Sequence, residues 1–145
     1  MKIRIKKTDP RARIPKRATP YSAGADLYMV CDGRITIKPG ETYMAHTGLC
    51  FEIPAGYAGL VYARSGLSVK RGIAPANKVG VIDSDYRGEV LVALFNQGVE
   101  PQILENGERI AQLVITPVID AEYSESPELS GSERGDGGFG STGDK

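Results

Sequence analysis

The amino-acid sequence predicts a single all-β domain with one short helix, and three observations support this class. Apolar and polar residues alternate with a period of two in several short segments, which is typical of strands. The 18 glycines and 9 prolines exceed average usage and separate these segments at intervals of about ten residues, as in β-sandwiches and barrels. The length of 145 residues corresponds to one domain.

The expected elements follow this pattern along the chain. Strands are predicted at residues 3–5, 34–38, 50–53, 60–63, 89–95 and 109–119, where Ile, Val, Leu and Phe recur. Turn signals between them include Pro39-Gly40 and Asn106-Gly107. The segment Arg64–Lys70 is the best candidate for a helical turn. Residues 80–89 are predicted to form a β-hairpin with the acids and Tyr86 at its bend.

The composition changes after Glu122. Residues 124–145 contain only two large apolar side chains, Leu129 and Phe139, and cannot bury enough surface to fold alone. We therefore expect a β-barrel domain over residues 1–122 and a flexible Gly-rich arm over residues 123–145. Two interpretations of the arm stay open: a disordered terminus, or a lid whose Phe139 and Arg134 close over a ligand with both a ring and phosphates.

Charge and cysteine content exclude several classes of protein. Basic and acidic residues number 18 each, which argues against a nucleic-acid or anionic-membrane surface. No apolar segment approaches the roughly 18 residues of a membrane span, and the start MKIRIKK has no signal core, so a cytoplasmic protein is expected. Cys31 and Cys50 are expected to be reduced packing residues, and the single His46 to be a packed or solvated side chain rather than a metal ligand.

Two clusters in the first half of the chain contain residues suited to chemistry. Small residues precede Asp26 in SAGADL, which suggests a tight turn with a carboxylate at a strand start, although a structural turn acid explains it as well. ARSGLS at residues 63–68 follows a predicted strand. Free backbone N–H groups and Arg64 there suit a phosphate, but the Walker pattern is absent and an N-capped turn with a surface Arg is the alternative.

Two further clusters lie later in the chain. Asn77 precedes GVIDSDYRGE, which is either a solvated acidic turn or a site where Asp83 acts as a general base beside a phosphate and Tyr86 stacks on a sugar or base. The D-x-D pattern suggests a divalent cation, but the calcium-loop pattern is not met. Gln112 lies within apolar RIAQLVI, where a buried amide needs hydrogen-bond partners. It is either a structural residue or one that faces a ligand.

Taken in order, these clusters and the arm resemble the five motifs of the homotrimeric all-β dUTPases. The matching segments are AGADL, ARSGLS, GVIDSDYRGEV, RIAQLVI and RGDGGFGSTG, and the resemblance spans residues 20–143. It implies a distorted jelly roll or β-barrel of the β-clip type and a homotrimer whose active sites are shared between subunits. It also implies Mg²⁺-dependent hydrolysis of dUTP to dUMP and pyrophosphate, which limits uracil incorporation into DNA and supplies dUMP for dTMP synthesis.

The resemblance also implies a role for each matching residue. Asp83 would orient and deprotonate the water that attacks the α-phosphorus, and Tyr86 would pack on the deoxyribose and leave no room for a 2′-OH. Asp26 would lie near the water shell of a Mg²⁺ that is held largely by the phosphates. The remaining residues would bind substrate: Arg64, Ser65, Gly66 and Gln112 at the phosphates; Asn77, Val81 and Ile82 at the uracil; Leu91 through its main chain; Arg134, Ser141 and Thr142 at the γ-phosphate; and Phe139 over the uracil, beside Gly140.

The sequence departs little from the family pattern. Ser68 occupies a variable position, and Asp136 places an acid near a site for a polyanion, which is expected to weaken binding slightly. The dCTP deaminases share the architecture but need a catalytic glutamate where this chain has VIDSDY. A catalytically silent nucleotide-binding member would lack Asp83, Tyr86 or the arm, and a β-sandwich without enzymatic activity would not combine all five motifs.

Overall fold

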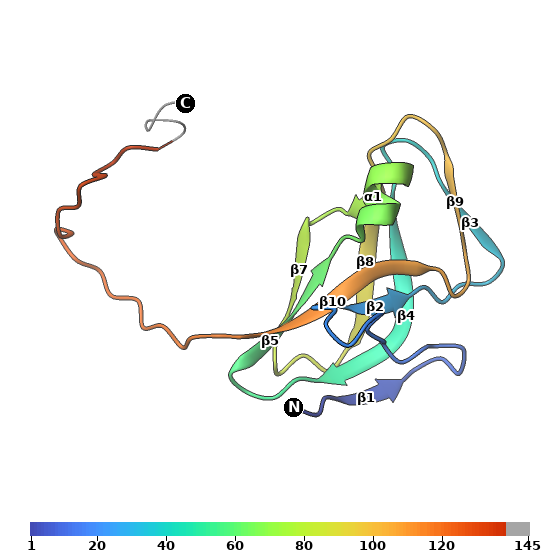
Figure 1. Ribbon diagram of the computed structural model, residues 1–145, viewed down its shortest axis with the longest axis horizontal. Helices are drawn as coiled ribbons and strands as arrows, with labels where there is room; N and C mark the ends of the chain where they lie inside the picture. The colour runs from blue at the N-terminus through green and yellow to red at the C-terminus, as the bar shows by residue number, and fades with distance from the viewer. Residues whose placement is uncertain (139–145) are drawn as a thin grey trace.

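The computed structural model describes residues 1–138 and contains ten strands and one short helix within them (Figure 1). The elements in chain order are β1 (Arg4–Lys7), β2 (Ala25–Tyr28), β3 (Arg34–Ile37), β4 (Thr42–Glu52), β5 (Tyr57–Tyr62), α1 (Ser65–Arg71), β6 (Ile73–Pro75), β7 (Val79–Ile82), β8 (Glu89–Asn96), β9 (Gln102–Glu105) and β10 (Arg109–Pro117). After β10, the chain runs away from the folded body without helix or strand as far as residue 138.

The strands form three antiparallel sheets, in the orders β1-β4-β8-β6, β2-β10-β5-β7 and β3-β9. Strands that follow one another along the chain always belong to different sheets, so the backbone crosses between layers at each connection. The all-β class and the distorted jelly roll are therefore confirmed, and the sheets do not close into a barrel.

The predicted hairpin over residues 80–89 is wrong. β7 pairs with β5, with Ile82 opposite Gly59, whereas β8 pairs with β4 and β6. The segment between β7 and β8 is thus a crossover between the two four-stranded sheets. Six residues separate the two strands, enough to span the roughly 10 Å between packed sheets, and the local pattern does not reveal which distant strand each one meets.

The remaining strand predictions overlap observed strands, with shifted bounds. The segment predicted at 50–53 is only the end of the 11-residue β4. The strand start expected at Asp26 corresponds to β2, whereas the sequence pattern does not predict β6 or β9. β6 (IAP) and β9 (QILE) are short and show no clear alternation of apolar and polar residues.

The hydrophobic core lies between the sheets. In β8, Val90, Val92 and Leu94 are buried while Leu91 between them faces outward, the alternation expected of a strand with one face on the core. Leu27 of β2 and Ile110 of β10 are fully buried in the same cluster. Each such side chain stabilises the fold by about 1.5–3 kcal/mol, so the strands that carry the site are held firmly.

Helix α1 follows β5, and it begins and ends one residue later than the predicted helical turn. Arg64 precedes it in extended conformation, and Gly72 ends it at φ 66°, with its N–H directed to the carbonyls of Leu67 and Ser68. This left-handed position favours glycine. Leu67 is the buried residue that ties the helix to the core.

Both cysteines are free, with Cys31 buried and Cys50 half-buried. His46 is largely exposed on β4 and hydrogen-bonds to Glu89. Among residues 1–138, no helix is both long and apolar enough to cross a membrane.

Candidate active site

The end of β5 and the middle of β10 bring three of the predicted site residues together. Gln112 on β10 lies opposite Asp26 on β2 and opposite Tyr62 on β5. The Gln112 amide donates to the carbonyl of Ala63 at 2.9 Å, and Arg64 Nε donates to Asp26 Oδ1 at 2.7 Å. Gln112 thereby fixes the backbone of Ala63, the residue before Arg64, and Asp26 orients the guanidinium group of Arg64.

Asp26 also pairs with a second arginine. Arg109 Nη1 lies 3.3 Å from Asp26 Oδ2, so both carboxylate oxygens have guanidinium partners. Asp26 is mostly buried, whereas Arg109 is half exposed. Each oxygen of Asp26 is thus already occupied by a cation, and this carboxylate presents no oxygen without a partner to a metal ion.

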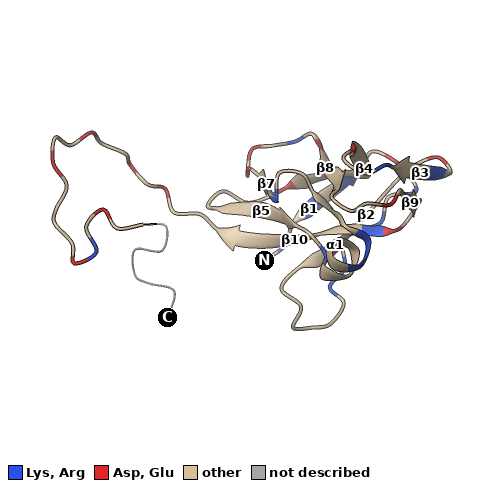
Figure 2. Ribbon diagram, turned by 90° about the horizontal axis from the view of Figure 1, so that it is seen from above, with Lys and Arg blue, Asp and Glu red and all other residues tan. Residues whose placement is uncertain are grey.

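A basic cleft of about 490 Å³ opens beside this cluster. Its lining includes Arg64 and Gly66, together with Arg13, Arg71 and Arg109, and Figure 2 shows the basic residues gathered next to α1 and the start of β10. Because the arginines outnumber the carboxylates that pair with them, Asp26 and Glu108, the cleft attracts anions.

Sequence reasoning missed three arginines that line this cleft, Arg13, Arg71 and Arg109. Arg109 is the first residue of RIAQLVI, the segment that contains Gln112, and Arg71 directly follows the predicted helical turn, so both stand beside residues that the sequence pattern marks. Arg13 gave no signal, because its guanidinium lies over the Tyr28 ring, 5.5 Å from the centroid, and against the backbone of Gly107, far along the chain.

A second group of predicted residues follows β6. Val79 N–H donates to the Asn77 carbonyl at 2.7 Å, and Lys78 between them has φ 63°. β7 leads from this turn to Asp83, whose carbonyl accepts from Tyr86 N–H at 3.2 Å. The turn leaves Asp83 and Tyr86 exposed to solvent.

Asp83 borders a separate cleft of about 560 Å³ with Tyr57, Ala58 and the residues just after β10. The exposed carboxylate is thus placed where a small molecule can reach it.

Asp83 and Arg64 lie at opposite ends of β5, whereas Asn77 lies near the same end as Arg64, because Val79 is opposite Tyr62. Ile82, next to Asp83, is opposite Gly59 near the start of β5, whereas Arg64 lies two residues beyond its end. At about 3.3 Å per residue, this separation is about 20 Å. One chain therefore does not bring Asp83 to Arg64, and the predicted site residues form two separate surfaces.

The predicted arm residues fall partly within the described chain. Arg134 Nε donates to the Gly137 carbonyl at 3.0 Å in a local turn, and acidic residues are spaced along the segment (Figure 2). Phe139, Gly140, Ser141 and Thr142 lie outside the described residues. Leu91 faces outward from β8.

An all-β fold with an arginine-lined cleft is typical of proteins that bind anionic ligands. Comparison with known proteins specifies the class further. The family model described as dUTPase matches residues 10–143. Deoxyuridine 5′-triphosphate nucleotidohydrolase of Desulfitobacterium hafniense is 50% identical over 144 residues, covering 99% of this chain and 95% of that protein. The chain belongs to the dUTPase family, whose members hydrolyse dUTP to dUMP.

Solved structures agree with this assignment. The dUTPase of Staphylococcus bacteriophage 80alpha, solved with dUpNHpp, superposes with a TM-score of 0.90 at 29% identity and covers 98% of each chain. A mutant dUTPase of phage phi11 of S. aureus, described with a structural Mg(II) ion, has a TM-score of 0.79 at 24% identity and covers 89% of this chain and 99% of that chain. The second likeness shows the shared fold alone.

Proposed function

We propose that the chain hydrolyses dUTP to dUMP and pyrophosphate by attack of water on the α-phosphorus, in active sites assembled from several subunits. The observation that carries this proposal is the separation of Asp83 from Arg64 at the two ends of β5. The turn that carries Asp83 and the cleft that carries Arg64 are each exposed to solvent, but within one chain neither lies beside the other. A neighbouring copy of the chain supplies the missing half.

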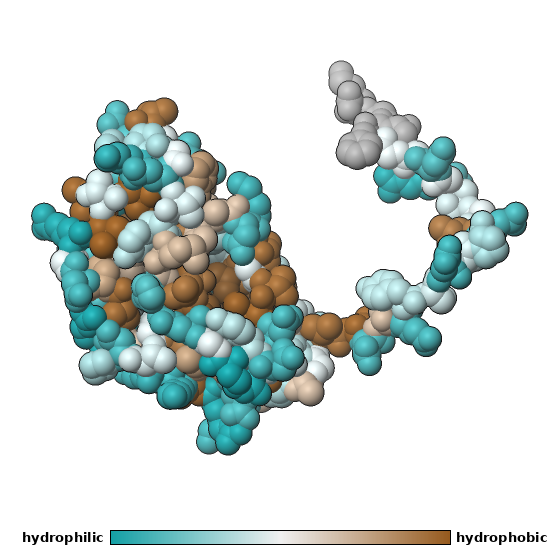
Figure 3. All heavy atoms as spheres, turned by 180° about the vertical axis from the view of Figure 1, so that it is seen from behind, coloured by the Kyte–Doolittle hydropathy of each residue, from teal (hydrophilic) through white to brown (hydrophobic). Residues whose placement is uncertain are grey.

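Exposed apolar side chains support a homotrimer. Val81 and Leu91 lie open on β7 and β8, and Val118 and Ile119 lie open just after β10. Figure 3 shows apolar surface on the folded body and at the base of the extended segment. Exposed apolar surface of this kind marks sites of protein association, and subunit contacts around the crossover between β7 and β8 would cover it.

In the proposed mechanism, Asp83 is the general base. Its exposed carboxylate accepts a proton from a water molecule as the water oxygen bonds to the α-phosphorus. The bond from that phosphorus to the bridging oxygen breaks, and the electron pair leaves with pyrophosphate. Arg64 of another subunit holds the phosphates through its forked N–H donors, with Ser65, Gly66 and Gln112 beside it.

The residues fit a Mg²⁺ ion that arrives with the substrate. Because guanidinium groups occupy both oxygens of Asp26, we propose that the triphosphate and water hold the ion and that Asp26 contacts it only through water. When bound, the ion would neutralise phosphate charge. Asp26 itself acts by orienting Arg64.

Selection of the substrate rests on the turn after β7 and on the arm. We propose that Tyr86 covers the deoxyribose and excludes a 2′-OH, while Asn77 and the main chain of Val81 and Ile82 read the uracil. Residues 123–145 would close the site of another subunit, with Arg134 at the γ-phosphate and Phe139 over the base. Closed over the substrate, this segment would exclude bulk solvent from the site and leave the attacking water in place.

The test measures pyrophosphate release from dUTP, UTP, dTTP and dCTP with Mg²⁺, and ammonia release from dCTP. We expect release from dUTP alone. Asp83→Asn should lower kcat by orders of magnitude with little change in dUTP binding, because only a proton acceptor is lost. Asp85→Asn in the same turn is the matched control and should stay active. Full activity of Asp83→Asn, or ammonia from dCTP, would refute the proposal.

A further inference from the structure

We infer that Gly88 and Glu89 are positioning residues for Tyr86, and that a bulge in β4 fixes both through the Glu89 side chain. Discrimination between deoxyribose and ribose would then depend on contacts that lie outside the substrate site. The inference rests on the proposed function, because it assumes that Tyr86 covers the sugar.

The Tyr86 ring is held by its hydroxyl rather than by core packing. The side chain is 45% exposed, and its hydroxyl donates to the carbonyl of Glu89 at 3.0 Å. The ring folds back over Gly88, where an added Cβ would lie 2.6 Å from the ring carbon Cζ. Because Gly88 has no side chain, the Tyr86 ring can lie over it. The hydrogen bond to the Glu89 carbonyl then fixes the position of the ring.

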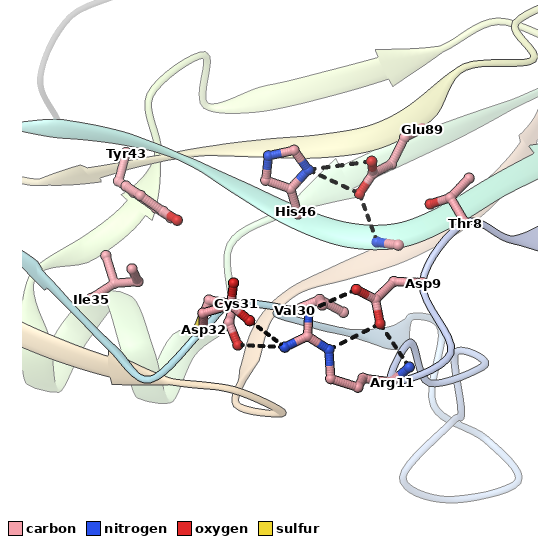
Figure 4. Close-up of a pocket in the computed structure, with 11 residues that line it drawn as sticks. Thr8, Asp9, Arg11, Val30, Cys31, Asp32, Ile35, Tyr43, His46 and Glu89 are labelled. Carbon is pink, nitrogen blue, oxygen red and sulfur yellow. Dashed lines mark hydrogen bonds and ion pairs between the residues drawn. The ribbon is translucent and has the colours of Figure 1, made fainter.

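Glu89 is in turn anchored to β4. The pairing of β4 with β8 shifts register between His46 and Cys50, and Gly48 within this bulge has φ 66°. The Gly48 N–H donates to Glu89 Oε1 at 2.7 Å, and His46 Nδ1 lies 3.3 Å from both carboxylate oxygens (Figure 4). The Glu89 side chain is only 24% exposed, so water screens these bonds weakly.

The bulge also holds the next residue of β8. The Thr47 side chain is fully buried, and its hydroxyl donates to the carbonyl of Val90 at 2.7 Å. Thr47 and Gly48 together thus replace regular ladder bonds and fix two consecutive residues at the start of β8.

The bulge itself packs closely against the N-terminal segment. A Cβ on Gly48 would lie 2.8 Å from Ala12 Cβ and 3.1 Å from Asp9 Cβ, and the Gly48 carbonyl accepts from Thr8 N–H at 2.9 Å. A continuous set of contacts therefore runs from the packed N-terminal segment through the bulge and Glu89 to the Tyr86 hydroxyl.

Breaking this set of contacts should change substrate choice more than catalysis. A ring released from the Glu89 carbonyl can tilt outward, which makes room for a 2′-OH. UTP should then become a better substrate relative to dUTP. A purely structural role of Glu89 predicts something different: both substrates would lose kcat/KM by the same factor.

The experiment measures kcat/KM for dUTP and for UTP in the wild type and in variants. Tyr86→Phe and Glu89→Ala should each lower the dUTP-to-UTP ratio by up to about tenfold, the effect of losing one hydrogen bond. Glu89→Gln keeps an acceptor for the Gly48 N–H and should restore most of the ratio. Glu105→Ala is the matched control, because Glu105 pairs with Arg34 at 2.7 Å between β3 and β9, and should leave the ratio unchanged.

The double variant of Tyr86→Phe and Glu89→Ala should lose no more than either single variant, since both break one pathway. An unchanged ratio in Tyr86→Phe or in Glu89→Ala, or additive losses in the double variant, would overturn the inference. Tyr86→Phe preserves the core and keeps the test decisive if Glu89→Ala does not fold. If Tyr86→Ala leaves the ratio unchanged, the proposed sugar contact itself is wrong and the inference falls with it.

Discussion

Asp26→Asn tests whether this carboxylate prepares Arg64 to bind phosphate. Asp26 Oδ1 accepts from Arg64 Nε at 2.7 Å, and Oδ2 accepts from Arg109 Nη1 at 3.3 Å. Asparagine preserves the shape and keeps one acceptor oxygen. Its NH₂ group, however, must face one of the two guanidinium groups, and a donor then meets a donor.

The exposure of the three side chains sets the magnitude. Asp26 is 12% exposed and Arg64 is 25% exposed, so their charge-assisted bond is worth about 1.5–3 kcal/mol. Arg109 is 50% exposed, and its longer contact contributes about 0–1 kcal/mol. Because asparagine keeps one neutral acceptor, we expect a net loss of about 1–2 kcal/mol, equivalent to about 5-fold to 30-fold in kcat/KM for dUTP.

The assay is steady-state pyrophosphate release across a range of dUTP concentrations. The loss should fall mainly on KM, since Arg64 is proposed to hold the phosphates, and Arg109→Ala should have a clearly smaller effect. Recovery of Asp26→Asn by excess Mg²⁺ would show that the residue acts through the metal's water shell instead. A kcat/KM equal to that of the wild type would refute the orienting role of Asp26.

Three further predictions concern other parts of the chain. Deleting residues 134–145 should sharply lower activity and leave the trimer intact by gel filtration; a fully active truncated chain would exclude the arm from the site. Arg11 hydrogen bonds lower the pKa of Asp9 from 3.8 to about 2, so this pair stabilises the fold above about pH 3.8 and ceases to do so as the pH falls to about 2. The advantage of the wild type over Asp9→Asn in urea midpoint should vanish across that interval, and a constant difference would contradict it. Burial raises the pKa of the Cys31 thiol, so mass spectrometry after brief labelling should find Cys50 modified first; equal labelling would contradict it.

The parts of the fold that the sequence predicted are those with a local signal. β10 was predicted because Ile110, Leu113 and Ile115 recur over a long β-branched segment. Most of β4 was not, because its alternation is interrupted by the bulge at Thr47 and Gly48, whose contacts are with β8 and the N-terminal segment. Pairing between distant strands leaves no trace in a short window, and for that reason the hairpin prediction was wrong.

In the candidate site, too, the residues with a local sequence signal were predicted and those that depend on distant contacts were not. Asp26, Arg64 and Gln112 stand in recognisable motifs, and the structure brings them into contact. Arg13 contributes to the basic cleft only through packing on Tyr28 and Gly107, and no neighbour in the sequence marks it. Sequence motifs therefore do not predict residues whose role depends on contacts between distant segments.

The separation of Asp83 from Arg64 along β5 has a genetic consequence. On the proposed trimer, a subunit that lacks Asp83 still offers an intact Arg64 to its neighbour, and the reverse also holds. Two inactive alleles, Asp83→Asn and Arg64→Ala, should therefore complement each other when their subunits mix. Random mixing of equal amounts would restore about one quarter of the sites, so a cell carrying both defective genes would regain dUTP hydrolysis that neither gene supports alone.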